Sequence, residues 1–189
     1  MRYMRGEAWW FLEPLGADAV LDILAQLRNL HADYVHPVSG DLRVLEDAGP
    51  RPIRGTGELL ALVDSRESLD VQLWLGPDSD TILSISRGSD DSALLVFDLD
   101  GLDCAETQVL LSAVTWVALS NPWTRWLVAD HRLPDTGDAW LAHLTGDHVV
   151  RPDDADVLLV ADRGGPVSRC TVTVGASPWC RPAARPPEG

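Results

Sequence analysis

The sequence contains one pair of acidic residues whose spacing could support chemistry. Residues 94–97 are apolar and typical of a strand, and Asp98, Leu99, Asp100 and Gly101 follow directly. Carboxylates at positions i and i+2 of a strand project from the same side. Two such groups can share Mg²⁺, a hard cation that prefers oxygen ligands. Asp98 and Asp100 are therefore candidate catalytic residues, and Mg²⁺ is the cofactor that they would require.

This segment resembles the first motif of the haloacid dehalogenase superfamily of phosphohydrolases, in which an apolar strand precedes Asp-x-Asp-Gly. The resemblance implies that Asp98 is the nucleophile that forms an aspartyl-phosphate, that Asp100 is the general acid/base, and that both hold Mg²⁺. It also implies a parallel Rossmann-like sheet. The family has Thr where Leu102 stands, and it uses a basic phosphate clamp, whereas this chain has no lysine. The alternative interpretation is structural: a strand end, an Asp-Gly turn, and a helix capped by Asp103.

Alternation of apolar and polar residues predicts the strands that would position these carboxylates. Residues 69–75, 81–87 and 93–99 alternate with a period of two, and turns rich in Gly, Asp and Ser separate them. Loops of about five residues connect antiparallel neighbours, so we expect a three-stranded meander. Symmetric pairing places six apolar residues on one face: Val71, Leu73, Leu83, Ile85, Leu95 and Phe97.

The opposite face of the meander is mixed in polarity. It carries Trp74, Ile82, Leu94 and Val96 among Asp70, Gln72, Ser84, Ser86 and Asp98. A fully solvated face would not need Trp74 beside Ile82, so we expect either a helix that partly covers this face or a contact patch. The binding residues that the sequence predicts are Trp74, Ile82, Asp98, Asp100 and Asp103.

The predicted fold class is α+β, with an antiparallel sheet packed by about four helices in one compact domain over residues 1–175. Helices are expected at 17–30, 57–66, 103–120 and 138–145, and Asp103 and Glu106 stand at capping-box positions of the third. Further strands are expected near 156–161 and 167–174, followed by a proline-rich irregular tail at 176–189. Residues 3–88 and 89–175 have similar element orders, which suggests an internal duplication with an offset of about 85 residues.

Composition narrows the class of partner. The 189 residues carry a net charge of -14, all 15 basic residues are arginine, and 22 of the 29 acidic residues are Asp. The GC-rich genome of a high-GC bacterium explains much of this bias, and adaptation to salt is the alternative. A negative surface disfavours nucleic acids and anionic membranes. Residues 64–106 hold 11 acidic residues against two arginines, an excess that suits docking to a basic protein.

The cysteines, histidines and tryptophans add weaker signals. Cys104, Cys170 and Cys180 form no C-x-x-C pair, and the five histidines lack metal-binding spacing, so we expect neither a disulfide framework nor a metal site. Targeting signals and membrane spans are absent from the sequence pattern, which predicts a cytoplasmic, reduced protein. The eight tryptophans either fill the core or line a pocket for a flat ligand.

Taken together, these patterns predict a non-enzymatic acidic binding protein. Its expected role is that of an inhibitor, an immunity-type protein or an accessory subunit that docks a basic protein partner. Two alternatives stay open: a Mg²⁺-dependent phosphohydrolase that uses Asp98 and Asp100, and a small-molecule sequestering protein with a Trp-lined pocket. The oligomeric state does not follow from the sequence.

Overall fold

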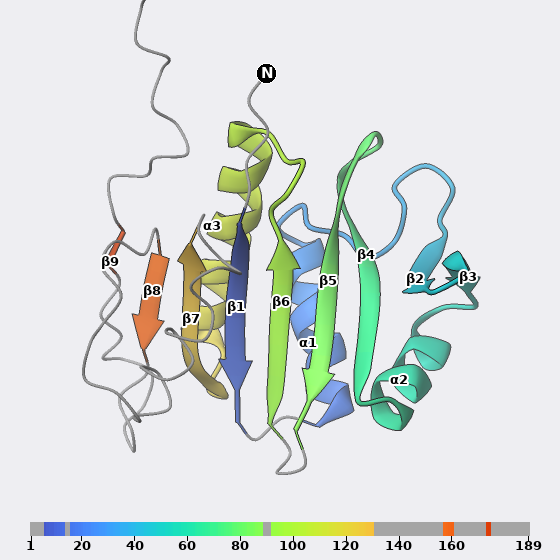
Figure 1. Ribbon diagram of the computed structural model, residues 1–189, viewed down its shortest axis with the longest axis horizontal. Coiled ribbons are helices and arrows are strands. Elements are labelled where there is room, and N and C mark those ends of the chain that lie inside the picture. The colour runs from blue at the N-terminus through green and yellow to red at the C-terminus, as the bar shows by residue number, and fades with distance from the viewer. Residues whose placement is uncertain (1–5, 14–15, 89–91, 131–156, 161–172, 175–189) are drawn as a thin grey trace, which may run out of the picture.

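One antiparallel sheet with three helices accounts for the part of the chain that the computed structural model describes, which is residues 6–13, 16–88, 92–130, 157–160 and 173–174 (Figure 1). The nine strands lie in the order β3-β2-β4-β5-β6-β1-β7-β8-β9, and every pairing between neighbours is antiparallel. The elements in chain order are β1 (Glu7–Leu12), α1 (Ala17–Arg28), β2 (Leu42–Glu46), β3 (Gly49–Ile53), α2 (Thr56–Ser65), β4 (Ser68–Gly76), β5 (Ser79–Arg87), β6 (Ala93–Asp98), α3 (Cys104–Ser120), β7 (Thr124–Asp130), β8 (Val157–Val160) and β9 (Thr173–Val174).

The predicted meander is confirmed as β4, β5 and β6 at the centre of the sheet. Val71 pairs with Leu83, and Leu83 pairs in turn with Phe97, so the symmetric register is also confirmed. The six apolar residues predicted to share one face all belong to the main core and are at most 1% exposed. This burial follows from the period-two pattern, because a slip of one residue would turn every one of them to the other face.

All three helices pack on the same face of the sheet. Side chains of α1, α2 and α3 join those of the strands in one hydrophobic core, and Figure 1 shows α1 and α3 behind the central strands. The other face carries a second, smaller apolar cluster, which consists of Trp9, Phe11, Leu94, Trp126 and Val128. The sequence predicted either a covering helix or a contact patch on this face. None of the helices in the described segments covers it.

Helix α3 begins where its sequence predicts. The side chain of Asp103 accepts hydrogen bonds from the backbone N–H groups of Ala105 and Glu106, and the Glu106 side chain accepts one from the N–H of Asp103. This reciprocal capping box satisfies three N–H groups that the first turn leaves without helical partners. The helix ends at Ser120, and Asn121 caps it through its backbone N–H to the Ala118 carbonyl.

A buried polar network ties β1 to the end of α3. The indole Nε1 of Trp10 donates to the Thr124 hydroxyl at 3.1 Å, and that hydroxyl donates to the Ala118 carbonyl at 2.8 Å. Each group is buried, so each needs the other as a partner. Trp10 therefore fills the core and also fixes the strand order β1-β7 beside α3.

The remaining predictions on secondary structure have mixed outcomes. Helices expected at 17–30 and 57–66 are present as α1 and α2, and β8 lies within the strand expected near 156–161. The expected helix at 138–145 and the tail at 176–189 lie outside the described residues, as does all but β9 of the strand expected at 167–174. Three helices are therefore described, where about four were expected.

The suggested internal duplication is not supported by the connectivity of the sheet. The strand after α1 is β2, which pairs with β3 and β4 away from the sheet centre. The strand after α3 is β7, which pairs directly with β1. Leucine-rich amphipathic helices align easily with one another, and this explains the similarity in sequence order without a repeat.

Two further observations concern membrane insertion and the cysteines. Within the described segments, none of the helices combines the length and the apolar character that a membrane span requires. Cys104, the first residue of α3, is disulfide-bonded, and the other cysteine of that bond lies outside the described residues. This bond corrects the expectation that the cysteines are reduced.

Candidate functional site

The Asp-x-Asp-Gly segment forms a braced turn at the end of β6. The carboxylate of Asp98 accepts the N–H of Asp100 at 2.8 Å, and the carboxylate of Asp100 accepts the N–H of Gly6 at 2.9 Å. Gly101 follows with φ +87°, a left-handed conformation that a side chain would strain. Asp98 is half-buried and Asp100 is exposed. Both carboxylates therefore take part in fixing the turn between β6 and α3.

The surroundings of β6 differ from those that the dehalogenase resemblance implies. β6 pairs antiparallel with β5 on one side and with β1 on the other, whereas the resemblance implies a parallel sheet. Among the described residues, no group of three or more His, Cys, Asp or Glu side chains is arranged to hold a metal ion. The geometry around Asp98 and Asp100 therefore does not favour phosphoryl transfer.

Burial raises the pKa of Asp98 above its ordinary value. The N–H of Asp100 donates to the carboxylate and lowers the pKa in part, and the negative charge of Asp100 raises it again. The hydroxyl of Thr81 donates to the backbone carbonyl of Asp98 and so holds this strand end against β5. Asp98 is thus an acid held in place beside another acid, without a cation to stabilise its ionised form among its described contacts.

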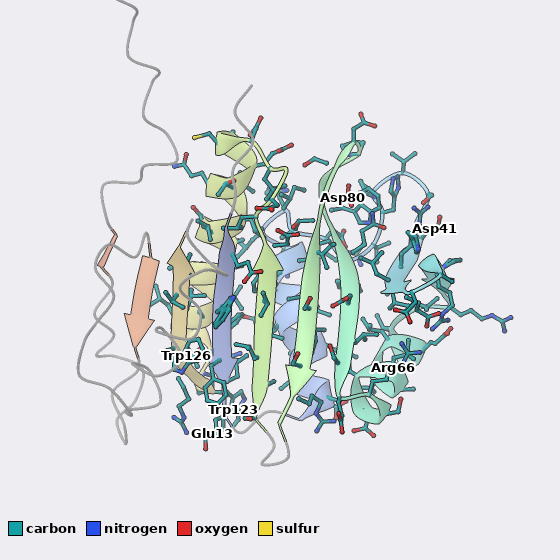
Figure 2. The ribbon with its side chains drawn as sticks, in the orientation of Figure 1. Glu13, Asp41, Arg66, Asp80, Trp123 and Trp126 are labelled. Atoms are coloured by element: carbon teal, nitrogen blue, oxygen red, sulfur yellow. The ribbon has the colours of Figure 1, made fainter. Side chains whose placement is uncertain are left out.

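Seven acidic residues gather at the same end of the sheet, and we call them the acidic rim. The start of β1, the β4–β5 turn, the end of β6 and the N-terminus of α3 all lie at this end, the upper one in Figure 1. Figure 2 labels Asp80 at the β4–β5 turn. The members are Glu7, Asp78, Asp80, Asp98, Asp100, Asp103 and Glu106.

Among the described residues, the hydrogen-bond donors to the acidic rim carry no positive charge. Besides the backbone N–H groups that Asp98, Asp100, Asp103 and Glu106 accept, Glu7 accepts the indole N–H of Trp9 at 2.6 Å. Asp80 accepts the side-chain amide of Gln72 at 2.5 Å. These donors are all neutral. They therefore bring no positive charge to these carboxylates.

The arginines of the described segments are paired elsewhere. Six of the seven form ion pairs, with Asp33, Asp41, Glu46, Glu58, Asp64 and Glu13, and none of these acids belongs to the rim. Arg66 and Arg51 share Glu46 and lie beside α2 and β3. In Figure 2, Arg66 lies far from Asp80, toward the other end of the sheet. The ion pairs of the described segments therefore do not include the rim carboxylates.

The rim also places like charges directly opposite each other in the sheet. Glu7 is the register partner of Asp98 on one side and of Asp130 on the other. Acidic residues in directly opposed positions destabilise a sheet. Unfavourable pairs of this kind, without a compensating contact among the described residues, are typical of a functional surface.

Trp74 and Ile82 lie on the face of the sheet that the sequence indicates, but they differ in accessibility. Trp74 stands outside the main core, as its strand phase predicts, yet it is only 7% exposed. His36 packs edge-on against its ring at 4.3 Å, and the Arg43 guanidinium lies 5.9 Å from the ring centre. Ile82 is half-buried and pairs with Gln72. Trp74 is therefore covered by His36 and Arg43 and offers little surface to a partner.

Of the five predicted binding residues, the structure brings Asp98, Asp100 and Asp103 together in the rim. Trp74 and Ile82 are not rim members but lie next to it on β4 and β5, with Trp74 the register partner of Asp80. Sequence reasoning missed Glu7, Asp78, Asp80 and Glu106 as members of one surface. The acid-rich composition of residues 64–106 was a signal for three of them. Glu7 gave no such signal, because it reaches the rim only through the pairing of β1 with β6.

Comparisons of this chain with protein-family models, with curated proteins and with solved structures gave no match.

Proposed function

We propose that this protein is a non-enzymatic acidic binding protein that docks a basic protein partner through the acidic rim. The role would be that of an inhibitor, an immunity-type protein or an accessory subunit. The observation that carries the proposal is that, within the described segments, the rim carboxylates form no ion pairs, while six of the seven arginines pair with other acidic residues.

A basic partner would supply positive charge that the rim lacks among the described residues. Asp98 and Asp100 repel each other in the free protein, because the negative charge of Asp100 raises the pKa of Asp98. Arginine or lysine side chains of a partner would relieve that repulsion on binding and would form charge-assisted hydrogen bonds. The long-range field of a protein with a net charge of -14 would also steer a basic partner and speed its association.

Capture of the partner and a charge-matched comparison test this proposal. The tagged protein is incubated at low salt with a lysate of the organism that encodes it, captured proteins are identified, and each is produced pure for titration calorimetry. Asp78→Asn, Asp80→Asn and Asp100→Asn are combined in one rim variant. We expect this variant to bind the partner about tenfold more weakly, or worse, than the wild type.

The matched control combines Asp18→Asn, Asp22→Asn and Asp47→Asn, three exposed residues outside the rim. It removes the same number of charges, so a general effect of net charge would weaken both variants alike. Equal loss in the two variants, or no basic protein captured at low salt, would overturn the proposal. Circular dichroism of both variants checks that they are folded.

A further inference from the structure

A disulfide attaches another part of the chain to the acidic rim. Cys104, the first residue of α3, is disulfide-bonded. In the sequence it lies between Asp103 and Glu106, the two rim members that form the capping box of this helix. The chain has three cysteines, so the other half of the bond is Cys170 or Cys180. The bond therefore holds a residue from the C-terminal end of the chain at the edge of the rim.

Both candidate cysteines have an arginine as a direct neighbour in the sequence. Arg169 precedes Cys170, and Arg181 follows Cys180. Residues 163–189, which contain both pairs, have four arginines and one acidic residue, a net charge of +3. The rest of the chain has 11 arginines against 28 acidic residues, a net charge of -17. Whichever cysteine is bonded, the disulfide therefore joins the one basic segment of this acidic chain to the rim.

The disulfide limits how far that arginine can be from the rim carboxylates. The Cα atoms of bonded cysteines are about 4–7 Å apart, and the next residue adds about 3.8 Å. The arginine beside the bonded cysteine therefore has its Cα no farther than about 11 Å from that of Cys104. An arginine side chain is long enough to shorten this gap to Asp103 and Glu106. Screening at physiological salt acts over about 8 Å, so the attraction between these charges persists.

We propose that residues 163–189 occupy the acidic rim in the oxidised protein, and that reduction of the Cys104 disulfide opens the rim to a basic partner. The inference rests on the proposed function, because it concerns regulation of the same surface. A group tethered by a covalent bond acts at an effective concentration on the order of millimolar. The tethered arginine therefore competes with a free basic partner for the same carboxylates, and this competition ends when the tether is cut.

The reduction follows ordinary thiol–disulfide exchange with a dithiol as the reductant. A thiolate of the dithiol attacks one sulfur of the bond and forms a mixed disulfide, and the thiol of the other cysteine is released. The second thiol of the reductant then attacks the mixed disulfide, releases the first cysteine and closes the reductant into its own disulfide. Two electrons and two protons pass to the two cysteines. Cys104 is half-buried, so its sulfur is partly accessible to such a reductant.

Titration calorimetry of the full chain with a hexa-arginine peptide at low salt tests this contact. Peptide mapping by mass spectrometry without reductant first establishes that Cys104 is bonded in the oxidised protein. We expect the wild type reduced with dithiothreitol to bind the peptide about tenfold more tightly, or better, than the oxidised wild type. A variant that combines Arg169→Gln and Arg181→Gln keeps the disulfide. In its oxidised form it is expected to bind the peptide as tightly as the reduced wild type.

The matched control combines Arg54→Gln and Arg66→Gln, two exposed arginines that flank α2. Its oxidised form is expected to bind the peptide within about twofold of the oxidised wild type. A gain as large as that of the other variant would mean that net charge alone matters, and would overturn the contact. Equal affinities of oxidised and reduced wild type, or an unbonded Cys104, would overturn it while docking at the rim still stands. Absence of peptide binding in every form would overturn both proposals.

Discussion

The capping box of α3 offers a stability test whose size can be worked out from the structure. Asp103→Ala removes the acceptor of two backbone hydrogen bonds, at 2.8 Å to the N–H of Ala105 and 2.9 Å to that of Glu106. Replacing an N-cap Asp by Ala costs about 0.5–2 kcal/mol of stability. This cost includes the loss of a negative charge that interacts favourably with the helix dipole at the N-terminus. We expect the free energy of unfolding to fall by about 1–2 kcal/mol.

Urea unfolding followed by circular dichroism measures this loss, with reductant present so that the Cys104 disulfide does not contribute. Asp103→Asn serves as the control, because its side-chain oxygen still accepts both hydrogen bonds and only the charge is lost. We expect the Asn variant to lose no more than about 0.5 kcal/mol. If the Ala variant unfolds like the wild type, or if the Asn variant loses as much as the Ala variant, the assigned role of Asp103 is wrong.

Two other substitutions probe buried polar contacts. Because burial and Asp100 raise the folded-state pKa of Asp98, the stability that its protonated form provides is present below the unfolded pKa and is lost as pH rises through the folded pKa. In urea unfolding, Asp98→Asn should therefore have the same free energy of unfolding as the wild type at acid pH, and an equal or higher one near neutral pH. A variant that is less stable than the wild type at neutral pH contradicts this. Thr124→Val leaves the Trp10 indole N–H without a partner and should cost about 1–3 kcal/mol in thermal unfolding. Thr124→Ser, which keeps the hydroxyl, should lose clearly less, and equal losses would refute the network.

Local patterns in the sequence were sufficient to predict the centre of the fold. The meander followed from strict alternation with short loops, and α3 followed from Asp103 and Glu106 at capping positions. Both signals act over a few residues, where turn chemistry and side-chain period dominate. The order of the sheet could not be predicted in this way, because β1 reaches its place between β6 and β7 through pairings across about 90 and about 120 residues.

The same limit explains what sequence reasoning found and missed at the rim. Asp98, Asp100 and Asp103 are neighbours in sequence and were found together. Glu7 joins them only because β1 pairs with β6. Trp74 had the correct strand phase, but its cover by His36 and Arg43 depends on how the chain between α1 and β2 folds back against β4.

The acidic rim is tested most directly by the dependence of the partner's dissociation constant on salt, measured side by side for the wild type and the triple variant of Asp78, Asp80 and Asp100. We predict that binding by the wild type weakens steeply as salt rises and that the variant shows a clearly shallower slope, because three of the contributing charges are gone. Equal slopes for the two proteins, or an affinity that salt does not change, would contradict a partner docked at the rim.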